Sequence, residues 1–195
     1  TEEEGELYIG CAGGKGTNAT FTYEQTDVPM NQFWFKLEVK GLNGGHSGSE
    51  IHKGLGNANK ILNRFLWILS RKIHVYLASI QGGNLHNAIA REASAVVGIP
   101  IRDKDEVVAM LNVFIAQIED ELKVVDPNVK IQIESTDQPE FVFDDKTTAG
   151  LINSICVCPH GVLAMSQDIP GLVEASTNLA SVKMKENNLY LRVQR

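Results

Sequence analysis

Two kinds of hydrophobic periodicity alternate along the middle of the chain. Some segments alternate apolar and polar side chains or form short apolar runs, as strands with a buried face do. Others repeat apolar side chains every three or four positions, which is the spacing of an amphipathic helix. In chain order, the pattern predicts a strand at 33–40, a helix at 51–69, strands at 73–81 and 93–100, a helix at 103–122 and a strand at 129–135.

This order of elements, within residues 32–135, predicts an α+β fold of the ferredoxin-like type. A βαββαβ order gives an antiparallel sheet with both helices on one face. An added edge strand is predicted at 19–24. After the core, the pattern predicts a partial second αββ unit, with a helix at 145–156, a loop through Pro159 and Pro170, and strands near 172–184 and 188–194.

Composition narrows the classes of function. The 195 residues are 43% hydrophobic and carry a formal net charge of -6, which is typical of a globular protein with a real core. An acidic chain without a basic tract disfavours binding to nucleic acid or to an anionic membrane, and no apolar run is long enough for a transmembrane helix. Three cysteines indicate a reducing compartment without a disulfide framework. The acidic start is unlike a signal peptide, and both ends indicate a piece cut from a longer protein.

His46 lies in a glycine-rich joint, residues 41–52, between a predicted strand and a predicted helix. Glycines let the backbone bend and let a ligand approach closely. A second joint, residues 82–91, follows another strand and carries His, Asn and Arg, which together suit an anionic or carbonyl ligand. Two plainer interpretations stay open, namely a turn histidine without a function and a β-turn with Asn in a left-handed conformation.

Three other segments contain residue types found at metal or phosphate sites. The acids at 2–4 more often face solvent than bind a metal. Residues 10–17 resemble a phosphate-binding loop, but the glycine spacing is one residue short and Gly16 replaces the Ser or Thr that binds magnesium. Residues 156–160 bring two cysteines close to a histidine, yet a structural zinc site needs a second ligand pair, so an ordinary loop with a buried cysteine is favoured. The sequence thus offers parts of a binding site and no complete catalytic machinery.

Four segments give the chain a specific, end-to-end resemblance to the bacterial aminoacyl-histidine dipeptidases, and they are residues 1–14, 41–59, 82–93 and 173–179. These enzymes belong to a family of co-catalytic zinc exopeptidases that includes carboxypeptidase G, carnosinases and succinyl-diaminopimelate desuccinylase. The family combines a catalytic domain, which binds two zinc ions, with a ferredoxin-like lid domain inserted into it. The resemblance implies that this chain is essentially the lid.

The same resemblance implies a division of the chain. Residues 1–15 correspond to a remnant of a catalytic-domain strand and its linker, and residues 16–195 correspond to the lid and dimerisation domain, with a core at 32–135 and an extension at 136–195. The zinc ligands of the family would all lie outside the chain, one of them immediately before Thr1. We therefore expect no metal site or cofactor in this chain, two zinc ions in the intact enzyme, and no hydrolysis by the isolated chain.

Three residues match positions to which the family assigns a role. His46 matches the lid histidine that stabilises the tetrahedral oxyanion beside zinc. Asn87 matches the asparagine that contacts the C-terminal carboxylate of the substrate, and Arg195 matches an arginine that binds the same carboxylate, with Arg192 as an open alternative.

The function implied by the resemblance is that of a lid and dimerisation domain in a cytoplasmic zinc dipeptidase that hydrolyses Xaa-His dipeptides. The expected partners are the dipeptide and a second subunit, because the strand at 73–81 and the helix at 51–69 match the dimerisation edge and helix of the family. No nucleic-acid or membrane partner is expected. A stand-alone module that binds a small ligand or another protein, without catalysis, is the alternative.

Overall fold

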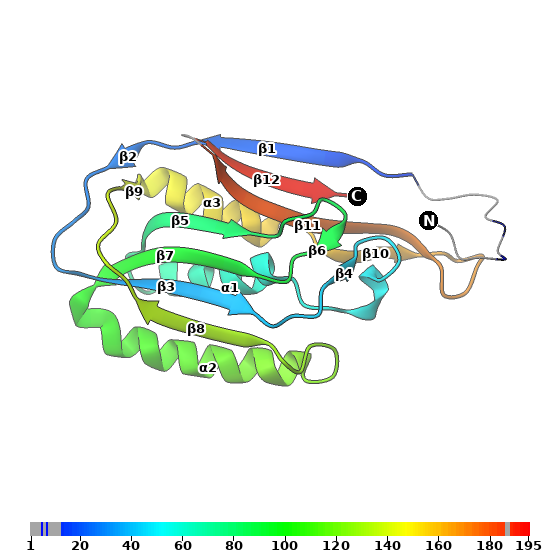
Figure 1. Cartoon of the computed structure of the whole chain (residues 1–195), viewed down its shortest axis with the longest axis horizontal. Coiled ribbons are helices and arrows are strands. Elements are labelled where there is room, and N and C mark those ends of the chain that lie inside the picture. The colour runs from blue at the N-terminus through cyan, green and yellow to red at the C-terminus, as the bar shows by residue number, and fades with distance from the viewer. Residues whose placement is uncertain (1–4, 6, 8–12, 186–187) are drawn as a thin grey trace.

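The computed structural model of this chain describes residues 5, 7, 13–185 and 188–195. Its main element is an eight-stranded sheet, in which seven strands follow the order β1-β12-β11-β5-β7-β3-β8 and the eighth, β10, pairs with β11 (Figure 1). Two small two-stranded sheets, β2-β9 and β4-β6, complete the strand pairing. Strands far apart in sequence are therefore neighbours in this sheet, for example β1 and β12.

The ferredoxin-like core predicted from the periodicity is confirmed. Its strands are β3 (Gln32–Lys40), β5 (Tyr76–Gly82), β7 (Ala93–Pro100) and β8 (Lys130–Ser135), which pair antiparallel in the order β5-β7-β3-β8. The two crossover helices are α1 (Ala58–Ser70) and α2 (Lys104–Leu122). Helix α1 packs against β3, β5 and β7 and also contacts α2.

The core fills the space between the sheet and the helices. From the sheet, Phe35 and Leu37 are fully buried, and from α1, Phe65 and Leu66 are fully buried against them. Because side chains alternate along a strand, every second residue of β3 reaches this layer. Within the described residues, no helix combines the length and the apolar content needed to cross a membrane.

The extension after the core contains α3 (Asp145–Val157), β11 (Val173–Lys185) and β12 (Asn188–Gln194), which confirms the predicted αββ unit. The added edge strand is β1 (Gly16–Thr22), and it pairs with β12. Strand β11 meets β5 through the pair Val182 and Gly82. The edge of β5 that the resemblance assigns to dimerisation is therefore occupied at its C-terminal end by the chain's own extension.

Two predicted elements were wrong in extent. The segment predicted as one helix at 51–69 forms two elements. A short 3-10 turn, η1 (Ile51–Lys53), comes first, and α1 begins at Ala58 after a break. The break occurs because Gly54, at φ 70°, ends the turn in the left-handed region, and because Asn57 caps α1 by accepting a hydrogen bond from the Lys60 N–H. The loop predicted through Pro159 contains a further strand, β10 (Gly161–Met165).

The remaining elements are short. They are β2 (Gln25–Thr26), β4 (Gly45–His46), β6 (Ala88–Ile89), η2 (Ile101–Asp103) and β9 (Val142–Phe143). Strands β4 and β6 belong to the two glycine-rich joints of the sequence. They pair with each other at the same end of the molecule as β10 and the end of β12 (Figure 1).

Candidate functional site

The two glycine-rich joints form one structural unit. Gly45 pairs with Ile89 and His46 pairs with Ala88 in the β4-β6 ladder. Next to this ladder, the Ser47 N–H donates to the Asn87 carbonyl oxygen at 2.9 Å. The structure therefore brings two of the predicted site residues together, with His46 at the end of β4 and Asn87 in the turn directly before β6.

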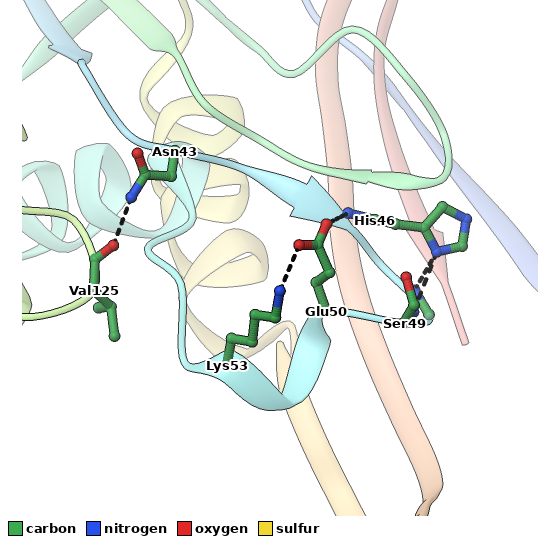
Figure 2. Close-up of polar contacts among 7 residues, drawn as sticks. Asn43, His46, Ser49, Glu50, Lys53 and Val125 are labelled. Atoms are coloured by element: carbon green, nitrogen blue, oxygen red, sulfur yellow. Dashed lines mark hydrogen bonds and ion pairs between the residues drawn. The ribbon is translucent and has the colours of Figure 1, made fainter. Parts of the chain in front are cut away.

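The imidazole of His46 is held by its own turn. Its Nδ1 atom accepts hydrogen bonds from the Gly48 N–H at 3.1 Å and from the Ser49 N–H at 3.2 Å (Figure 2). Since Nδ1 accepts, the neutral ring carries its proton on Nε2. The side chain is exposed, so this turn presents His46 as an oriented N–H donor.

Glu50 fixes the backbone of the same turn. Its Oε2 atom accepts from the His46 N–H at 2.8 Å, and its Oε1 atom pairs with Lys53 Nζ at 2.8 Å (Figure 2). The Lys53 ammonium, and after it the His46 N–H, hold the pKa of the Glu50 carboxyl below its usual value. Glu50 therefore stays ionised and keeps its hydrogen bond to the backbone of His46 at neutral pH.

Two glycines of this turn lie close to neighbouring side chains. Gly44 has φ 65°, and a Cβ there would collide with the Arg91 side chain. A Cβ at Gly48 would lie 3.1 Å from His46 Cε1, closer than most real contacts of this kind. These glycines let the Arg91 stem and the imidazole pass close to the backbone.

A buried carboxylate binds both ends of the segment that carries His46. Asp126, which follows α2, is fully buried. Its Oδ1 atom accepts from the Asn43 N–H at 2.6 Å and its Oδ2 atom accepts from the Gly56 N–H at 2.6 Å. One side chain thus fixes both ends of residues 43–56, a role that no local sequence pattern indicates.

The third predicted residue, Arg195, directly follows β12. Its backbone N–H and carbonyl form a pair of hydrogen bonds with Lys15 at 2.9 and 2.6 Å. The preceding Gln194 pairs across the sheet with Asn178 of β11, and the Asn178 amide donates to the Ala88 carbonyl of β6 at 2.8 Å. The end of β12 is therefore connected, through Asn178, to the unit that carries His46.

Arg192 and Arg195 both have exposed side chains. Arg192 lies within β12, and Arg195 directly follows its last residue. The choice between the two arginines as the carboxylate ligand stays a prediction.

The cysteine and histidine segment at the end of α3 supports α1. The Lys60 ammonium donates to the carbonyl oxygens of Ile155, Cys156 and Cys158 at 2.8, 2.9 and 2.7 Å, which satisfies the end of that helix. His160 Nδ1 lies 3.3 Å from Asn57 Nδ2. Burial first, and then the Lys60 charge, lower the pKa of His160 from its usual 6.5 to about 4.

This lowered pKa predicts a pH dependence of stability. The unfolded chain binds a proton at His160 near pH 6.5 and the folded chain near pH 4, so stability falls as the pH falls through that window. Between pH 7 and 4.5 we expect His160 to account for a loss of about 2 kcal/mol in the free energy of unfolding. Urea unfolding across that range measures the loss. A His160→Gln variant should lack most of this slope, and an equal slope in both proteins would contradict the assignment.

The described residues do not provide a metal site. Ranges 13–185 and 188–195, with residues 5 and 7, contain no group of three His, Cys, Asp or Glu side chains placed to hold a metal ion. Cys156 is exposed, and Cys158 is half-buried beside Lys60. The acids at 2–4, and residues 10–12 of the glycine-rich segment at 10–17, lie outside the described residues. The zinc pair of the resembled family does not fit the residues that are described.

Comparison with known proteins adds three findings. Residues 34–126 match the family model M20_dimer, described as a peptidase dimerisation domain. Over 191 residues, or 98% of its length, the chain is 37% identical to the cytosol non-specific dipeptidase of Escherichia coli strain K12. The solved structure of an aminoacylhistidine dipeptidase from Vibrio alginolyticus matches 100% of this chain with a TM-score of 0.94 and 34% identity. The chain spans 39% and 40%, respectively, of these two proteins.

Proposed function

This chain contains a peptidase dimerisation domain of the M20 family, and from that premise we propose that it acts as the lid and dimerisation domain of a dipeptidase. The observation that carries the proposal is the exposed His46 ring, oriented as an Nε2–H donor, within a chain that matches two dipeptidases over nearly its whole length. In this proposal residues 16–195 are the lid, and residues 1–15 lead into it from the catalytic domain.

The proposed contribution of this chain is electrostatic. When a peptide carbonyl is attacked, negative charge develops on its oxygen, and a fixed N–H donor lowers the energy of that state. His46 would donate from Nε2 to this oxygen, since Nδ1 is already bonded to the turn. Asn87 and Arg195 would bind the free carboxylate of the dipeptide and set its position relative to His46.

The rest of the proposal concerns the complete enzyme. Two zinc ions would be held by residues outside this chain, as is usual for the resembled family. We propose a cytoplasmic location, which agrees with the name of the Escherichia coli relative, and a homodimer formed through this domain. The substrate class is dipeptides with a free carboxylate, including Xaa-His.

Recognition of the carboxylate gives a direct test in the full-length protein. Replacing Arg195 by alanine is expected to raise KM for a dipeptide by about tenfold to 100-fold, because a charge-assisted hydrogen bond is lost. The matching dipeptide amide, which has no carboxylate, should be hydrolysed equally poorly by both proteins. Steady-state kinetics on the acid and amide substrates measure the difference.

Arg192→Ala is the matched control, because it removes the same charge from an exposed position within β12, three residues away. If it raises KM in place of Arg195→Ala, the carboxylate ligand is Arg192. If neither variant changes the preference for the acid, the proposed carboxylate site is wrong. Measurable dipeptide binding by the isolated chain in titration calorimetry would instead favour the stand-alone binding module.

A further inference from the structure

Asn178 lies at the crossing of three segments. It belongs to β11, and its side chain is 1% exposed. Its Nδ2 atom donates to the Ala88 carbonyl at 2.8 Å, and its Oδ1 atom accepts from Asn57 Nδ2 at 3.4 Å. A buried amide is stable only when its donors and acceptors are paired, so these two contacts fix its orientation.

The acceptor of this hydrogen bond lies beside both predicted site residues. Ala88 follows Asn87 in sequence and pairs with His46 across the β4-β6 ladder. The Asn87 carbonyl also accepts from the Ser47 N–H at 2.9 Å. A shift of the Ala88 carbonyl would therefore move His46 and Asn87 relative to the sheet.

The other contact of Asn178 reaches a rigid element. Asn57 caps α1, and its Nδ2 atom also donates to the Leu179 carbonyl at 2.9 Å. The hydrogen bonds of Asn57 thus join the start of α1 to strand β11. Residues 84–87, in contrast, are exposed, so the loop that carries Asn87 has few packing contacts of its own.

We propose that Asn178 is a positioning residue for the dipeptidase reaction, holding the Ala88 carbonyl so that His46 and Asn87 keep a fixed place relative to β11 and the end of β12. This inference rests on the proposed function of His46. Its physical basis is that catalysis depends on the place of a donor, and a misplacement of about 1 Å can lower turnover by about 100-fold. Through Gln194, which pairs with Asn178, the same residue relates the end of β12 to this unit.

The test uses Asn178→Asp, which keeps the shape and the acceptor but removes the N–H donor to Ala88. In the 195-residue chain, amide hydrogen exchange by NMR should show Ser47 exchanging at least about tenfold faster, because its acceptor loop loosens. In the full-length protein, kcat should fall by about tenfold to 100-fold.

Asn63→Asp is the matched control. Asn63 is also 1% exposed, and its Nδ2 atom donates to one carbonyl, that of Ile152, at 2.9 Å between α1 and α3. It should lower the melting temperature comparably without changing Ser47 exchange or kcat. If Asn178→Asp does not fold, Asn178→Ser, whose hydroxyl is too short to reach Ala88, is used with the same readouts.

The possible outcomes separate the two proposals. Ser47 exchange and kcat that match those of the Asn63 control would overturn the role of Asn178. If His46→Ala leaves turnover unchanged, the proposed function fails, while faster exchange at Ser47 in the Asn178 variant still supports its effect on the turn. Faster Ser47 exchange together with a lower kcat, both larger than in the Asn63 control, supports the positioning role.

Discussion

If the full-length protein is the dipeptidase we propose, replacing His46 by alanine in it is expected to lower kcat by about 10²–10³ while changing KM little. The reason is that a donor directed at a developing negative charge acts mainly in the transition state. The Gly48 and Ser49 N–H groups hold Nδ1, which leaves Nε2–H as the outward donor. Steady-state kinetics measure the change, with metal content checked in the same preparation.

The control for this experiment is His52→Ala. His52 is exposed in η1, six residues after His46 and in the same segment, so it reports general effects of losing a nearby imidazole. It should keep kcat within about twofold, as surface substitutions usually change little. A His46→Ala enzyme with unchanged turnover would show that the histidine is an ordinary turn residue.

Replacing Gly83 by alanine is expected to lower the free energy of unfolding by about 2–5 kcal/mol, the sum of left-handed backbone strain and overpacking. Gly83 has φ 69°, and a Cβ there would collide with the Ala180 carbonyl oxygen of β11. The contact joins the loop that carries Asn87 to β11, so neither backbone can move away without disturbing the sheet. Urea unfolding monitored by circular dichroism gives the change.

Gly54→Ala separates the two causes. Gly54 has nearly the same φ, 70°, but no heavy atom lies within 4 Å of the position its Cβ would take. This variant should show the backbone strain alone, about 1–2 kcal/mol. Equal losses in the two variants would mean that the loop at Gly83 can move away from β11.

Most of the fold could be predicted from the sequence, because the period of apolar residues within each element indicates its type. Apolar residues repeat with period two in β3 and with helical period in α2, and each element needs a partner for its apolar face. The start of α1 was missed because apolar residues at 51–57 resemble helical spacing, while Gly54 and the cap at Asn57 end one turn and begin another. Strand β10 was missed because its residues are mostly exposed and its pairing with β11 is irregular.

The candidate site was only partly readable from the sequence. The glycine-rich joints indicated His46 and Asn87, because glycine lets the backbone adopt unusual conformations and lets a ligand approach closely. His46 itself is held by its own turn, but the contacts that attach the two joints to the rest of the fold involve partners distant in sequence, namely Asp126 for Asn43 and Gly56, and Asn178 for Ala88. No periodicity marks a buried Asp or Asn whose partner is a backbone group some 70 to 90 positions away.

By itself, the sequence therefore determined the ferredoxin-like core, its αββ extension and the residues that could carry chemistry, since hydrophobic period and glycine content act over a few residues. The tertiary structure decided which nitrogen of His46 is free to donate, how the two joints pair, and that β11 occupies part of the β5 edge. These features depend on hydrogen bonds and close contacts whose geometry exists only once the chain has folded.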